Sequence, residues 1–349
     1  MLARTNEKAL SPFVGAMIFA VVAIIGFAYV KWVPYYGKAF LAQSHHFIGD
    51  SIISGKSASA PPVSWSAAVD YAISYSNAIW KALVLGLILG SGIKVLLPTQ
   101  WVSNAFGRMG FRSVTLGSLF AIPCMMCTCC AAPVATGMRQ SRASVGSVVS
   151  WWISNPVLNP ATLVFMGFVL GWGWALFRVV FGVVMVLGVA YLAERYGGQH
   201  DDIALKVETM PEVAGPNENI LIRWVREFLT LSIKLVPEYL ILVLLLGAAR
   251  AWLFPVLGVH DGVFWIVAMA IAGTLFVIPT AGEVPIVQAM LALGMGAGPA
   301  GALIMTLPAV SLPSLAMLGA VFNLQTRLVI TASVVLLGIV AGFVAMTTF

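Results

Sequence analysis

Apolar residues run through this chain in long stretches, separated by short polar or proline-containing interruptions. A membrane-spanning helix needs about 20 mostly apolar residues. Stretches of that kind lie at about 13–34, 76–97, 174–194, 224–254 and 327–347. Proline and glycine interrupt the apolar pattern in further segments at about 113–138, 143–172, 263–295 and 299–321. The pattern therefore predicts an all-α, polytopic membrane protein that contains proline-broken or re-entrant helices.

The N-terminal part of the chain predicts an extra span followed by a loop. The apolar stretch at 13–34 follows basic residues, as a signal peptide would, but no small-x-small cleavage site comes after it. We therefore expect an uncleaved helix there and a loop of mixed polarity at about 35–75. His45 and His46 lie in that loop, where a histidine pair is more often solvated surface than a metal site.

The interrupted segments occur in two similar sets. Gly117-Ser-Leu-Phe-Ala-Ile-Pro123 matches Gly273-Thr-Leu-Phe-Val-Ile-Pro279, with five of seven residues identical. Each set also has two later prolines at the same spacing, Pro133 and Pro156 in the first and Pro285 and Pro308 in the second. Transporters are commonly built from two such halves, with substrate sites at broken helices. The matches therefore predict an internal repeat.

We divide the chain accordingly into an N-terminal helix and loop at 1–75, a first repeat at 76–194, a polar linker at 195–222 and a second repeat at 223–349. Each repeat has two full helices and two interrupted segments. If the interrupted segments cross the membrane, a repeat has four passages, and if they re-enter as hairpins it has two. Both numbers are even, so we predict two parallel repeats of the same orientation.

Arginines flank the first interrupted segment on both sides. Arg108 and Arg112 precede it, and Arg139 and Arg142 follow it. Basic residues in short loops are enriched on the cytoplasmic side of a membrane. This bias places all four arginines on one side and favours a hairpin that enters and leaves there.

Composition narrows the class of protein further. Hydrophobic residues make up 60% of the chain and charged residues 9%, with a mean hydropathy of +0.97, whereas soluble domains carry roughly 25% charged residues. The sequence pI of 9.3 reflects cationic loops rather than a nucleic-acid surface, because no basic run alternates with aromatic residues. We expect a lipid bilayer and a small-molecule or ion substrate as partners, no nucleic acid and no cofactor, and the sequence leaves a homo-oligomer open.

All four cysteines lie in one seven-residue window, Cys124-Met-Met-Cys127-Thr-Cys129-Cys130, between Pro123 and Pro133. Thiolates are soft ligands for copper(I), zinc and similar ions, and they capture trivalent metalloids. Cysteine also packs well as a small apolar residue, but that explanation suits one cysteine better than four. We therefore predict that all four thiols bind substrate, with Cys127, Cys129 and Cys130 as ligands if the solute is a soft metal or metalloid.

Other polar residues lie beside the remaining proline breaks. Asn155 and Asn159 stand next to Pro156 and Pro160, where their amides would replace lost backbone partners or contact a solute. Thr280 and Glu283 occupy the second-half position of the cysteine window. An ionisable residue at membrane depth is a functional candidate, so we predict that Thr280 binds substrate and Glu283 couples transport to protons. The alternative is a structural ion pair of Glu283 with Lys94, Lys234 or Arg250.

These motifs resemble the predicted permease family that includes YraQ-type proteins and the ArsP organoarsenical efflux permeases. The residues that carry the resemblance are the Cys-rich segment Gly117–Ala135, the Asn-Pro segment Ser154–Leu163 and the segment Phe276–Ile286. The resemblance covers the chain from about residue 76 and implies a multi-pass permease of the bacterial inner membrane. Its arsenical branch implies efflux of trivalent organoarsenicals, but that branch commonly has a sparser cysteine pattern than this chain.

The sequence thus predicts a proton-coupled permease that moves a soft, thiol-reactive solute, such as a metalloid, an organoarsenical, a soft metal or a sulfur species. No Gly-x-x-x-x-Gly-Lys-Ser/Thr motif is present to suggest ATP as the energy source. Two alternatives remain open. One is a membrane thiol–disulfide oxidoreductase that uses Cys124 and Cys127, and the other is a channel for a small neutral solute.

Overall fold

The computed structural model describes residues 11–55, 60–108, 110–208, 219–255 and 259–349. These parts of the chain are almost entirely helical, with one isolated β-bridge between Ser51 and Gly55 and no β-strand. Six of their helices are long and apolar enough to cross a membrane. Many large apolar side chains point outward from the long helices, as expected where the surrounding solvent is lipid. The predicted all-α, polytopic membrane fold is confirmed.

The N-terminal span is longer than the sequence predicted. It comprises α1 (Pro12–Phe27), a π-helical turn η1 (Ala28–Trp32) and α2 (Val33–His45) without a gap. The prediction of a loop from residue 35 was wrong. Pro34 lies in the first turn of α2, where proline does not disrupt a helix, and the π-helical turn η1 joins α2 to α1 without a gap. The helix ends at His46, whose φ of 50° is left-handed.

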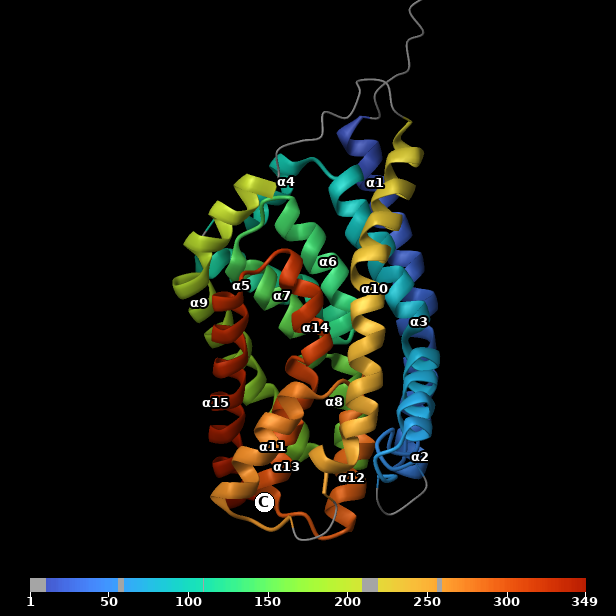
Figure 1. Ribbon diagram of the computed structural model, residues 1–349, viewed down its shortest axis with the longest axis vertical. Helices are drawn as coiled ribbons and strands as arrows, with labels where there is room; N and C mark the ends of the chain where they lie inside the picture. The colour runs from blue at the N-terminus through green and yellow to red at the C-terminus, as the bar shows by residue number, and fades with distance from the viewer. Residues whose placement is uncertain (1–10, 56–59, 109, 209–218, 256–258) are drawn as a thin grey trace, which may run out of the picture.

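Two antiparallel pairs of long helices frame the molecule (Figure 1). In the first pair, α3 (Trp65–Leu96) packs on α10 (Ile220–Leu253): Lys94 pairs with Glu227 near one end, and Tyr71 lies against Gly247 near the other. In the second pair, α9 (Trp172–Glu208) packs on α15 (Leu324–Thr348) in the same antiparallel sense. Both α3 and α10 extend beyond their predicted limits, and α9 covers the first part of the predicted linker, whose residues 209–218 lie outside the described residues.

Two short helical hairpins enter the molecule between these pairs. The first consists of α5 (Phe111–Ala121), η2 (Ile122–Cys124) and α6 (Thr128–Gln140), after a short helix α4 (Thr99–Phe106). Its two ends lie together, because the backbone N–H of Ser144 donates to the carbonyl of Phe106 at 2.8 Å. The second consists of α11 (Val263–Leu275) and α12 (Glu283–Ala292), and its ends are joined by Gly296 N donating to Val259 O at 3.1 Å.

The remaining interrupted segments continue in one direction instead of turning back. One consists of α7 (Val145–Val157) and α8 (Pro160–Val169), and the other of α13 (Ala297–Ala309), α14 (Leu312–Met317) and η3 (Leu318–Ala320). Figure 1 shows α7 and α8 following one another down the molecule, and α13 and α14 following one another up it. Each half of the chain therefore has one segment that turns back and one that passes through.

The predicted parallel relation between the halves is wrong. Helices α3 and α10 correspond in the proposed repeat and run in opposite directions, as do α9 and α15. The first hairpin lies with α4 in the upper part of Figure 1, and the second hairpin reaches in from the lower end. The reason is the number of times that each half crosses the molecule. Two full helices and one crossing segment give three passages, and the hairpin adds none. Three is odd, so the halves are inverted.

Glycines on α3 allow the first hairpin to lie directly against that helix. A Cβ added to Gly86 would overlap the carbonyl oxygen of Cys130, and one added to Gly90 would overlap that of Pro133. Pro133 lies inside α6 and lacks the N–H that would bond the carbonyl four residues earlier. The close approach of α3 thus packs α6 at the turn that proline weakens, and it fixes the position of the cysteine segment.

Candidate functional site

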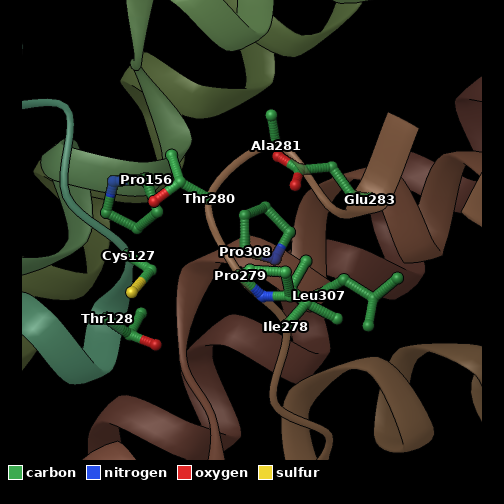
Figure 2. A pocket seen from close by; sticks show the side chains of 10 residues that line it. All are labelled: Cys127, Thr128, Pro156, Ile278, Pro279, Thr280, Ala281, Glu283, Leu307 and Pro308. Carbon is green, nitrogen blue, oxygen red and sulfur yellow. The ribbon is translucent and has the colours of Figure 1, made fainter. Parts of the chain in front are cut away.

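The tips of the two hairpins meet inside the molecule and form one small pocket of about 10 Å³, room for about one water-sized group (Figure 2). The first hairpin contributes Cys127 and Thr128, and the second contributes the loop before α12 together with Glu283. Prolines of the two crossing segments close the pocket. Its full lining is Cys127, Thr128, Pro156, Ile278, Pro279, Thr280, Ala281, Glu283, Leu307 and Pro308. The thiol-bearing break thus faces the carboxylate-bearing break.

The first break is held open by side chains from other helices. Helix α5 ends in the short 3₁₀ turn η2, Met125 has a left-handed φ of 51°, and α6 begins after Cys127. The free carbonyl of Pro123 accepts a hydrogen bond from Trp32 Nε1 at 2.7 Å. The N–H of Met126 donates to Asn155 Oδ1 at 3.3 Å. Backbone groups that a continuous helix would satisfy are therefore bonded to side chains, as burial in an apolar environment requires.

The second break is held in a similar way. Residues between α11 and α12 are not helical, and their carbonyls point to α3. Tyr71 OH donates to the carbonyl of Val277, and Tyr75 OH donates to that of Ile278 at 3.4 Å. Ala281 has a φ of 66°, a region that is strained for a residue with a Cβ. Both hairpin tips thus contain one non-glycine residue in a left-handed conformation.

The four thiols do not converge on one point. Cys127 and Cys130 lie one helical turn apart, and their sulfur atoms are 3.0 Å from each other. Cys129 lies on another side of α6, 3.6 Å from Ser311 Oγ, and Cys124 donates to the carbonyl of Phe120 at 3.2 Å. Among the described residues, no group of three or more His, Cys, Asp or Glu side chains is arranged to hold a metal ion.

Two predictions about the cysteines therefore need correction. The metal-ligand set of Cys127, Cys129 and Cys130 is not brought together, because helical spacing places Cys129 on a different face from the other two. The Cys-x-x-Cys pair that is in contact is Cys127 with Cys130 and not Cys124 with Cys127. All four thiols are free and buried.

Glu283 forms a buried ion pair at the first turn of α12. Its Oε1 lies 2.6 Å from Arg178 NH1 on α9, and both side chains are shielded from solvent. Arg178 also donates from Nε to the carbonyl of Val157 at 3.0 Å and from NH2 to that of Pro156 at 2.7 Å. The expected partners of Glu283 were wrong: Lys94 pairs with Glu227, and Arg178 binds Glu283.

A second cation, Lys31 of the N-terminal span, lies behind the pocket and contacts its lining residue Thr280. Lys31, in the π-turn η1, is only 4% exposed. Its Nζ donates to Thr280 Oγ1 at 2.9 Å and to Tyr35 OH at 3.4 Å. Thr280 thus lines the pocket and is one of the contacts that the hairpins make with the extra span, as Pro123 is through Trp32.

The predicted asparagines support the site without lining the pocket. Asn155 Nδ2 donates to the carbonyl of Trp151 at 2.9 Å, while its Oδ1 accepts from the first break. Asn159 caps α8, with Oδ1 accepting from the N–H groups of Ala161 and Thr162. Both residues therefore replace lost backbone partners, which is one of the two roles that the sequence suggested.

Sequence reasoning missed Lys31 and Arg178. Arg178 is a charged residue inside the apolar run that begins at Trp172, and an ionisable group at such a position is a functional candidate by default. Lys31 lies near the end of the helix that the sequence predicted at 13–34. Recognising that the helix continues to His45 would have placed Lys31 in its middle.

Comparison with known proteins shows which family the chain belongs to. The model of the ArsP family, described as a predicted permease, matches residues 9–153 and 64–347. The chain belongs to this predicted permease family. UPF0718 protein YraQ of Escherichia coli (strain K12) is 52% identical to this permease over 332 residues, which are 94% of each chain. UPF0718 protein MJ0584 of Methanocaldococcus jannaschii is 22% identical over 330 residues, 76% of this permease and 90% of the relative.

No solved structure matches this permease significantly. The family and the apolar helices show that it is a multi-pass membrane transporter rather than an enzyme, with lipid and a small-molecule substrate as its partners. The family therefore argues against the alternative of a membrane thiol–disulfide oxidoreductase.

Proposed function

We propose that this protein is a proton-coupled permease of the bacterial inner membrane that moves a soft, thiol-reactive small solute. The solute would be a metalloid, an organoarsenical, a soft metal ion or a sulfur species. The observation that carries the proposal is the pocket in which Cys127 of one hairpin faces Glu283 of the other. Substrate sites of transporters commonly lie where discontinuous helices meet between two halves of a fold. The 52% identity to a protein of Escherichia coli supports the proposed location in a bacterial membrane.

The Cys127–Cys130 pair is our candidate for the solute contact. Cys127 lines the pocket, and Cys130 touches it sulfur to sulfur at 3.0 Å. Two sulfur atoms on one helical turn offer a soft, polarisable surface that oxygen ligands do not provide. Thr128 and Thr280 add hydroxyl groups from the two hairpin tips. The small pocket suits a solute of a few atoms.

The Arg178–Glu283 pair is our candidate for coupling. It joins the second hairpin to α9, and Arg178 also holds the end of α7 through the carbonyls of Pro156 and Val157. A proton that neutralised Glu283 would remove the charge that binds this hairpin to Arg178. Protonation would thus release the second hairpin tip from the first half of the molecule, and deprotonation would restore the bridge.

The opposite entry of the two hairpins suggests how access alternates. Each hairpin separates the pocket from one face of the molecule, because its two ends lie together on that face. Movement of one hairpin would open the pocket on one side while the other kept it closed. This is the gating of one repeat against the other around a fixed site that inverted repeats permit.

Purified protein in proteoliposomes tests the role of the thiols. We expect the double substitution Cys127→Ser and Cys130→Ser to abolish solute counterflow, because serine keeps the size of cysteine but is a poor soft ligand. The matched control is Cys124→Ser, which lies in the same window but outside the pocket, and it should transport as the wild type does. Counterflow at the wild-type rate in the double variant would contradict the proposal. Flux without counterflow would instead indicate a channel.

A further inference from the structure

The charges around the pocket are unbalanced. Arg178 and Glu283 neutralise each other at 2.6 Å. Lys31 is buried, donates to the hydroxyl groups of Thr280 and Tyr35, and lies 5.2 Å from the centroid of the Tyr35 ring, so all of these partners are uncharged. Among the described residues, no carboxylate forms an ion pair with Lys31. The ammonium of Lys31 therefore adds a net positive charge beside the pocket.

A buried charge without a counter-ion is costly to keep. Transferring an ammonium from water to an apolar environment is unfavourable unless the ammonium is paired as well as hydrogen-bonded. Two hydroxyl oxygens supply dipoles but no opposite charge. An anion in the pocket, on the other side of Thr280, would supply that charge.

The ends of two helices favour the same sign of charge. Helix α6 begins directly after Cys127, and α12 begins at Glu283, so both N-termini border the pocket. Helix N-termini carry partial positive charge and unpaired N–H groups. The carboxylate of Glu283 offsets the positive charge at the N-terminus of α12, but α6 has no acidic residue in its first turn. The field of α6 thus adds to that of Lys31.

We propose that Lys31 of the extra N-terminal span makes the pocket selective for a soft solute that carries negative charge. This inference rests on the proposed function and narrows its substrate class to small reduced-sulfur anions. A soft metal cation would meet the repulsion of Lys31, and a neutral metalloid acid would leave the ammonium without a counter-charge. No covalent step is needed, because the thiols of Cys127 and Cys130 can donate weak hydrogen bonds to a sulfur anion.

Lys31 would act on the solute through its charge and through its hydrogen bond to Thr280, without lining the pocket, so it is a positioning residue. Its helix is otherwise largely exposed on the outside of the bundle, with 11% of its most apolar window buried. The extra span is therefore a functional part of the transport site. Removing the charge should change which solute is taken up, whereas a purely structural lysine would affect all solutes alike.

The test is uptake of separate probes into proteoliposomes that contain the full-length chain. The probes are radiolabelled thiosulfate, hydrosulfide, arsenite in its neutral acid form and silver(I). We expect the wild type to take up one or both sulfur anions faster than arsenite or silver. Lys31→Gln should reduce anion uptake by about tenfold or more, the effect of losing one interaction with a charged donor. Lys31→Arg, which keeps the charge, should restore most of the uptake.

Lys38→Gln is the matched control, since Lys38 lies on the same span but is exposed, and it should transport like the wild type. Gel filtration of each variant distinguishes a transport defect from misfolding. Preference of the wild type for arsenite or silver, uptake of none of the probes, or full anion uptake by Lys31→Gln would overturn the inference. Preference for arsenite or silver, or full anion uptake by Lys31→Gln, would leave the proposal of a thiol-dependent permease standing. That proposal is contradicted by normal transport in the Cys127→Ser, Cys130→Ser variant.

Discussion

At the scale of single residues, the site is built from charges that bridge separate helices. Arg178 on α9 binds Glu283 on α12, and Lys31 on the N-terminal span binds Thr280. Breaking a buried ion pair by removing one partner typically costs about 3–5 kcal/mol, because an uncompensated charge remains. Removal of either charge of the Arg178–Glu283 pair is therefore expected to lower the stability of the protein.

Glu283→Gln tests the coupling role of the carboxylate. Glutamine keeps the shape of glutamate and a hydrogen-bond acceptor for Arg178, but it cannot take up and release a proton. We expect this variant to bind solute and to lose the stimulation of transport by an imposed pH gradient, measured as proteoliposome uptake with and without that gradient. Glu238→Gln, an exposed glutamate on α10, should keep the response. A gradient response of wild-type size in Glu283→Gln would leave the Arg178–Glu283 pair with a structural role alone.

At the scale of elements, the sequence predicted where helices break better than how the broken pieces continue. The breaks at Pro123 and Pro279 were placed correctly, because a proline in a helix interior removes a backbone hydrogen bond, although Pro133 lies inside α6 without breaking it. Proline does not specify whether the next piece turns back or goes on, since that depends on contacts such as Ser144 N to Phe106 O. For the same reason, the sequence located Thr280 and Glu283 but not their partners Lys31 and Arg178.

Gly90→Ala tests how the cysteine hairpin is held in place. The added methyl group would overlap the carbonyl of Pro133, so α3 and α6 would have to move apart. Overpacking of this kind typically costs about 1–3 kcal/mol, and we expect a lower melting temperature in detergent together with slower transport. Gly37→Ala is the control, because nothing lies within 4 Å of the added Cβ and alanine favours the helix. An unchanged melting temperature in Gly90→Ala would show that the contact is not tight.

At the scale of the whole molecule, the two halves form an inverted arrangement with an extra span on one side. Corresponding long helices run in opposite directions, and the hairpins enter from opposite ends. In the mechanism we propose, the two hairpins would serve as gates on opposite sides of the pocket, as alternating access requires. We propose that the two halves arose as a repeat, in keeping with the match of Gly117–Pro123 to Gly273–Pro279.

Opposite entry of the hairpins can be tested by labelling single cysteines in a background in which the four native cysteines are serine. Asn104→Cys and Arg142→Cys mark the ends of the first hairpin, and His260→Cys and Ala292→Cys mark those of the second; all four positions are exposed. We expect a membrane-impermeant maleimide to label the first two from one side of the membrane and the last two from the other, in vesicles of both orientations. Labelling of all four from one side would support the parallel arrangement that the passage count first suggested. Labelling of Asn104→Cys and Arg142→Cys from opposite sides would mean that the cysteine segment crosses the membrane, and the pocket would then not lie between two hairpin tips.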